Sequence, residues 1–138
     1  LQELVNVLHG SLVSSGSDRL TGAGRSGTPQ MAAPGASDIL DLAGWQNIPD
    51  RFNDRPFHQH NRLIKNVAFN AEERSEIAKA IIDRLAVATG LTQYFLPRHG
   101  IEEWDKPGEQ AHDPEGLIAF VSATEAAAPG RVILSALD

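Results

Sequence analysis

Two histidines separated by a single residue, His58 and His60, have the spacing in this sequence that is best suited to chemistry. Alternate residues of a β-strand point to the same face, so imidazoles at this spacing lie roughly 6.5–7 Å apart and can share one Zn²⁺ ion. His112 is a third candidate ligand, in a polar loop that also carries His99 and Asp113. A bound metal would activate water for attack on an ester, amide or phosphodiester. Surface histidines beside a turn would give the same pattern.

Other chemical patterns in the sequence lack the surroundings that they need. Residues 22–27, GAGRSG, match G-x-G-x-x-G and are similar to the glycine loops of phosphate-binding domains. Such a loop requires a strand before it and a helix after it, whereas a Ser/Gly stretch precedes this one and prolines follow, so we expect a flexible glycine arm. Glu102 and Glu103 are adjacent, and adjacent carboxylates cannot easily flank one glycosidic bond. No G-x-S-x-G nucleophile elbow occurs in the sequence.

Composition narrows the possible functions. The 138 residues carry a formal net charge of −6, which disfavours general nucleic-acid binding. The absence of cysteine excludes disulfides and thiolate chemistry. No apolar run is long enough for a transmembrane helix, and the first residues lack the pattern of a signal peptide, so a cytoplasmic or particle-associated location is favoured. The sequence does not begin with Met, which indicates a processed product or a fragment.

The first residues have the spacing of an amphipathic helix. Their apolar stripe consists of Leu1, Leu4, Val5, Leu8 and Leu12. We expect a helix over residues 1–12 that ends at Gly10 or continues to about Val13. A helix this short is marginal in water, so its stripe needs a surface to pack against.

A polar segment, residues 14–37, follows this helix and has nearly no large apolar side chains. Such a composition does not repay the entropy lost on ordering. We therefore expect an extended arm that becomes fixed against a second molecule. The prediction divides the chain into this arm with its helix, residues 1–37, and a body, residues 38–138.

The body contains one strongly patterned helix, predicted over residues 71–89. Asn70 and Glu73 have the spacing of a capping box, and Gly90 follows as a stop signal. Its buried face is predicted to consist of Ile77, Ala78, Ile81, Ile82, Leu85 and Ala88.

The remaining elements of the body are short. Ser37 is a candidate N-cap for a helical turn or two that reaches Trp45. Apolar runs predict strands at residues 57–68, 91–96, 117–121 and 132–134. The last two are separated by about ten residues, which is too few for a parallel crossover with its helix, so we expect them to pair antiparallel.

The sequence thus predicts an α+β fold with one central amphipathic helix, a small and mostly antiparallel sheet, an N-terminal helix and a loop-rich arm. We expect a non-enzymatic subunit of a larger assembly, such as a virion or a bacterial complex, whose partners are other protein subunits or copies of itself, and no membrane or bulk nucleic acid. The expected interface residues are Leu1, Leu4, Val5, Leu8, Leu12, Arg25, Trp45 and Trp104. The alternative is a small hydrolase or toxin domain with a histidine-centred site, and only that alternative implies a cofactor, a divalent metal such as zinc.

Overall fold

The structure is a computed structural model that describes residues 1–11 and 16–137. It contains helices and two small sheets, which confirms the expected α+β class. One sheet is antiparallel and the other is parallel, where a mostly antiparallel sheet was expected. Within the described ranges, the helices are too short or too polar to cross a lipid bilayer.

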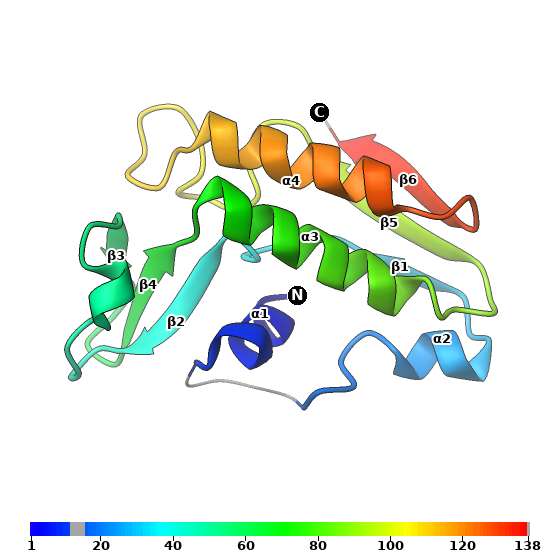
Figure 1. Cartoon of the computed structure of the whole chain (residues 1–138), viewed down its shortest axis with the longest axis horizontal. Coiled ribbons are helices and arrows are strands. Elements are labelled where there is room, and N and C mark those ends of the chain that lie inside the picture. Colours follow the sequence, from blue (N-terminus) through cyan, green and yellow to red (C-terminus); the bar gives the residue numbers. More distant parts are fainter. Residues whose placement is uncertain (12–15, 138) are drawn as a thin grey trace.

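The parallel sheet has the strand order β1-β5-β6. Its strands are β1 (Gln30–Ala32), β5 (Thr92–Pro97) and β6 (Val132–Leu137). Helix α3 (Ala71–Leu85) precedes β5, and helix α4 (Pro114–Ala127) connects β5 to β6. Both helices lie on the same face of this sheet, where they pack side by side (Figure 1).

The antiparallel sheet is inserted between β1 and α3, in the order β2-β4-β3. Its strands are β2 (Ile39–Ala43), β3 (Phe57–Gln59) and β4 (Ile64–Ala68), with a 3-10 turn at Asp50–Phe52. The predicted helix from Ser37 to Trp45 is therefore wrong. Residues 39–43 pair with β4 along their whole length, and four of the five are buried, so tertiary pairing outweighs the local capping signal.

The long strand predicted over residues 57–68 is a hairpin of β3 and β4. Asn61 lies in its turn, where its side-chain oxygen accepts hydrogen bonds from the amides of Leu63 and Ile64, at 2.7 and 3.0 Å. A short polar side chain that caps the backbone in this way favours a turn over a continuous strand.

Helix α3 confirms the most strongly patterned prediction. The Asn70 side chain accepts from the Glu73 amide at 2.9 Å, and the Glu73 carboxylate accepts from the Asn70 amide at 3.0 Å, which completes the capping box. The apolar face of α3 is buried, with Ile77, Ile81 and Leu85 fully inside. The helix ends at Leu85, four residues before the predicted end.

Helix α4 replaces the strand that was predicted over residues 117–121. Asp113 caps its first turn, accepting from the Gly116 amide at 2.9 Å, and Pro114 occupies the first helical position. The predicted antiparallel pairing with residues 132–134 is therefore also wrong, because β6 lies parallel to β5. A run of five apolar residues fits a buried helix as well as a strand, and the cap was the signal that distinguished them.

Helix α1 (Gln2–His9) packs its stripe into the core of its own chain. Leu4 and Val5 are fully buried there. Gly10, with a φ of 75°, ends the helix in the left-handed conformation that glycine favours. The expected contact at Leu12 lies outside the described residues.

The described part of the arm, residues 16–37, lies on the chain's own body. It contains the short helix α2 (Gly22–Ser26), in which Gly24 approaches Ala88 so closely that a Cβ on Gly24 would be 3.0 Å from the Ala88 Cα. The Thr89 amide donates to the Gly24 carbonyl at 3.1 Å. The described part of the arm is therefore not an extended tether, because backbone hydrogen bonds and close glycine packing compensate for the missing apolar side chains. The expected contact with a second molecule stays a prediction.

Candidate functional site

A buried polar cluster lies where the carboxyl ends of β1 and β5 meet the amino ends of α3 and α4. Open α/β sheets bind their ligands at this edge. The loop after β1 contributes Ser37 and Asp38, and the loop after β5 contributes Glu102 and Asp105. Arg74, near the start of α3, lies among them.

The Arg74 guanidinium is fully buried between α3 and α4. Its Nη1 donates to Asp105 Oδ2 at 3.0 Å, and its Nε donates to the Phe69 carbonyl at 3.2 Å. Its Nη2 lies 3.8 Å from Asp113 Oδ2 and makes no hydrogen bond among the residues that the structure describes. Gly116 gives the guanidinium stem its space, since a Cβ there would be 2.8 Å from the Arg74 Cδ.

Asp105 collects three donors on its buried carboxylate. Besides Arg74, Oδ2 accepts from the Ile101 amide at 3.3 Å, and Oδ1 accepts from the Asp113 amide at 3.0 Å. His112 Nδ1 lies 3.9 Å from the same Oδ1. This carboxylate therefore holds together the loop after β5 and the start of α4.

Asp38 is the unusual member of the cluster because it is completely buried and neither carboxylate oxygen accepts a hydrogen bond from another residue in the described ranges. Burial raises the pKa of Asp38 to about 7, although Arg74 acts to lower it. The neighbouring Glu102 also has a raised pKa, again mainly through desolvation. Near neutral pH the cluster thus holds a protonated or partly protonated acid beside the Arg74–Asp105 ion pair.

Next to this cluster a hollow of about 260 Å³ opens between the start of α3 and the start of α4. It is lined by Arg55, Pro56, Ala68, Phe69, Asn70, Ala111, His112 and Asp113, and we call it the α3–α4 hollow. Arg55 pairs with Glu73 at 2.6 Å on its rim. Burial acts to raise the pKa of Glu73, but hydrogen bonds from Arg55 and from the Asn70 amide outweigh it and lower the pKa.

The structure brings two of the three predicted metal ligands together, but not with the third. The ring of His58 stacks on Trp104 at a centroid distance of 4.0 Å, and the rings of His58 and His60 are 6.3 Å apart. The Gln110 amide donates to His58 Nδ1. His112 instead faces Asp105 and the α3–α4 hollow. Among residues 1–11 and 16–137, no three metal-ligating side chains gather around one point.

The residues expected at an interface have different positions. Leu4 and Val5 are buried in the core, Leu1 is half-buried and Leu8 is exposed. Trp45 is 66% exposed. The other two lie apart from these, with Arg25 exposed on α2 and Trp104 half-buried beside the histidine pair.

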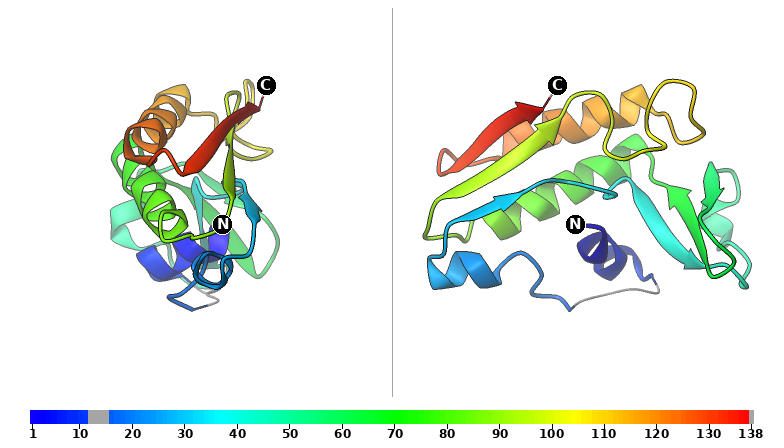
Figure 2. Two further views of the ribbon diagram at one scale, coloured as in Figure 1. Left: turned by 90° about the vertical axis from the view of Figure 1, so that its right-hand side faces the viewer. Right: turned by 180° about the vertical axis from the view of Figure 1, so that it is seen from behind.

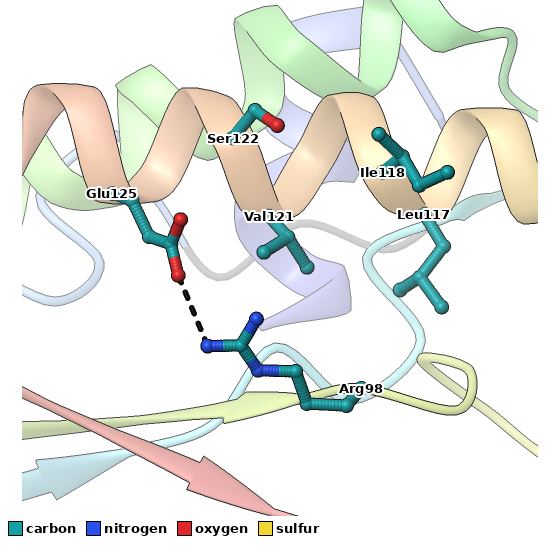
Figure 3. Close-up of a pocket in the computed structure, with 6 residues that line it drawn as sticks. All are labelled: Arg98, Leu117, Ile118, Val121, Ser122 and Glu125. Carbon is teal, nitrogen blue, oxygen red and sulfur yellow. Dashed lines mark hydrogen bonds and ion pairs between the residues drawn. The ribbon is translucent and has the colours of Figure 1, made fainter.

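A third region, on the opposite side of α4, is a hollow of about 280 Å³ between α4 and the end of β5. Leu117, Ile118 and Val121 give it an apolar wall (Figure 3). Arg98 and Glu125 form an ion pair across it at 3.1 Å. Its polar groups satisfy each other, so it offers less for ligand chemistry than the α3–α4 hollow.

Sequence reasoning missed Arg74, Asp105 and Asp38 as site residues. Arg74 falls within a helix whose pattern is otherwise ordinary, and nothing in the sequence marks it as buried. Asp113 was considered as a polar loop residue near His112, whereas the Asp-Pro pair at 113–114 is a recognisable helix start. Recognising it would have placed these side chains at the start of α4.

Fold and site together define an α+β domain with a buried polar cluster at the carboxyl edge of a small parallel sheet. The chain belongs to the family described as "Uncharacterised protein family (UPF0261) C-terminal domain", which it matches over residues 1–138. It is 42% identical over 138 residues to a UPF0261 protein of Brucella melitensis, covering all of this chain and 33% of that protein. The chain thus spans about a third of the length of such relatives.

More distant relatives extend across kingdoms. A UPF0261 protein of Clostridium tetani is 33% identical over 100 residues, which cover 72% of this chain and 25% of that protein. The ToMV susceptible protein tm-1(GCR26) of Solanum lycopersicum is 26% identical over 113 residues, which cover 82% of this chain and 15% of that protein.

Proposed function

We propose that this chain is a small-molecule-binding domain that takes a compact anion, carboxylate or phosphate, in the α3–α4 hollow. The observation that carries the proposal is the convergence of two helix amino ends on one hollow whose rim also holds Arg55 and His112. Helix amino ends favour anions through their unpaired amides and their dipoles.

The charges around the hollow are consistent with an anion that binds at its rim and stays partly exposed to solvent. Arg55 already pairs with Glu73, and Asp113 is partly exposed, so the rim is close to neutral without a ligand. Arg74 supplies a buried positive charge behind Asp113, and its Nη2 is a donor with no hydrogen-bond partner in the described part of the chain. An anion that displaces the Asp113 side chain would reach this donor.

Thermal unfolding with inorganic phosphate and succinate as probes tests this proposal. A ligand at 100 times its dissociation constant stabilises the folded state by about 2.7 kcal/mol, which raises the melting temperature measurably. Arg55→Met should weaken the effect, whereas Arg131→Met, at an exposed position away from the hollow, should not. Amide NMR shifts at Ala71 and Glu72 should locate the binding. If neither probe shifts the melting temperature, or both variants respond like the wild type, the proposal fails.

An acid–base hydrolase is a second candidate, supported by the position of His112. The carboxylate of Asp105 lies 3.9 Å from its Nδ1, which is too long for a hydrogen bond, so the two groups would have to approach each other for the carboxylate to orient a catalytic imidazole. The candidate predicts turnover of p-nitrophenyl acetate or phosphate that disappears in His112→Gln and survives in His99→Gln. Equal rates for the two variants would reject it.

The assembly role expected from the sequence stays a proposal, and the arm that was to mediate it lies against its own chain. A contact-making role would need another surface. The parallel sheet provides one.

A further inference from the structure

One face of the parallel sheet is covered by helices and the other is not. Along β5, Thr92, Tyr94 and Leu96 are buried, and the residues between them are only half-buried. The register places side chains from all three strands on this second face, which we call the open face: Met31, Gln93, Phe95, Ile133, Ser135 and Leu137. Figure 2 shows both helices on one side of the sheet and none of the drawn elements across the other.

The open face is apolar where it is most exposed. Met31 is 73% exposed, Ile133 is 47% exposed and Leu137 is 46% exposed. In the register the polar Gln93 lies between the first two, and its side-chain amide donates to Ser135 Oγ at 2.9 Å, so the exposed apolar side chains flank a polar centre. Parallel sheets in folded proteins almost always have both faces covered.

The free edge of β1 is a second indication that the parallel sheet lacks a neighbouring element. Strand β1 pairs only with β5, and within residues 1–11 and 16–137 no strand pairs with its other edge. An unpaired edge exposes backbone donors and acceptors that can take another strand.

Chain topology indicates what covers this face. Crossovers between parallel strands are right-handed, so strands added in one direction place all their helices on one face. The order β1, β5, β6 runs in one direction, which accounts for α3 and α4 lying together. Helices reach the other face when the sheet also grows in the opposite direction, from the edge of β1, as in doubly wound sheets.

We propose that, in the longer proteins of this family, polypeptide outside the matched region adds a strand to the free edge of β1 and packs at least one apolar helix on the open face. The Brucella melitensis relative has two thirds of its length outside the match, which is ample for such a unit. This inference does not rest on the ligand proposal, because the α3–α4 hollow lies among the helices on the other side of the sheet.

Cysteine labelling tests the inference, because this chain contains no cysteine of its own. In a chimera, this chain replaces the segment of the Brucella melitensis protein that it matches. The labelling rate of Met31→Cys is then compared between this chimera and the 138-residue chain. Maleimide labelling, located by peptide mass spectrometry, should be at least about tenfold slower in the chimera. Lys79→Cys, exposed on α3, is the matched control and should react equally in both. Equal rates at Met31→Cys would overturn the inference.

Two further measurements keep the test decisive. If the chimera does not fold, hydrogen exchange on the unmodified Brucella protein replaces it: the peptide that matches residues 30–32 should exchange as slowly as a central strand, and rapid exchange would overturn the inference. Light scattering tests the alternative that a second copy of the chain packs on the open face. A dimer of the 138-residue chain that protects Met31→Cys would assign the open face to a second copy and would also overturn it.

Discussion

Replacing Asp105 by Asn should destabilise the protein strongly. The substitution leaves the fully buried Arg74 charge without its closest counter-ion, and breaking a buried pair in this way costs about 3–5 kcal/mol. The amide cannot replace the carboxylate, because both Asp105 oxygens accept from donors: Arg74 and Ile101 on one side, and Asp113 on the other. In either orientation, the new NH₂ group meets an N–H group.

Urea unfolding followed by far-ultraviolet circular dichroism measures the loss. For a denaturant slope of about 1–3 kcal/mol per molar urea, a loss of 3 kcal/mol lowers the midpoint by between about 1 and 3 M. The control is Asp83→Asn, which makes the same chemical change on the exposed side of α3 and should alter stability by less than about 0.5 kcal/mol.

A double-mutant cycle separates the ion pair from the other roles of Asp105. Arg74→Met combined with Asp105→Asn should lose less than the sum of the two single variants, with a coupling of at least about 1 kcal/mol. If Asp105→Asn behaves like Asp83→Asn, the buried pair does not hold α3 and α4 together and the reasoning is refuted.

Three further predictions concern neighbouring residues. Burial raises the pKa of Asp38 from 3.8 to about 7, so its contribution to stability is complete below about pH 4 and is lost as the pH rises through 7. The stability of Asp38→Asn relative to the wild type should therefore increase by up to about 4 kcal/mol between pH 4 and 8, measured by urea unfolding at each pH. Parallel pH profiles for the two proteins would contradict this. Gly116→Ala should lose about 1–3 kcal/mol, since its Cβ would be 2.2 Å from Asp113 Oδ2, whereas Gly130→Ala meets no neighbour and should be neutral by calorimetry. Asn70→Ala should lose about 1 kcal/mol through the broken capping box, and an unchanged melting temperature would exclude that role.

The elements that the sequence predicted correctly are those whose signals are local. Helix α3 has its capping box and apolar stripe within one continuous segment, so its existence and face follow without knowledge of the rest of the chain. Helix α1 follows from its stripe in the same way. The prediction of a helix at the position of strand β2 was wrong because the strand's stability comes from pairing with β4, a partner more than twenty residues away.

The candidate site was largely beyond sequence reasoning. The rings of His58 and His60 are 6.3 Å apart, although only His58 lies on β3 and His60 follows the end of that strand. The Arg74–Asp105 pair joins residues 31 positions apart, and Asp38 comes from a third segment. Side chains of this kind are common on surfaces, and only the packing of α3 against α4 takes them out of water.

By itself, the sequence determined the fold class, the central helix and its buried face, because helix periodicity and capping are encoded in neighbouring residues. The tertiary structure decided where residues 16–37 lie, which sheet is parallel, and which polar groups are buried. These outcomes depend on close backbone approach and on hydrogen bonds between distant segments. Neither the close backbone approach nor these hydrogen bonds can be predicted from composition or residue spacing.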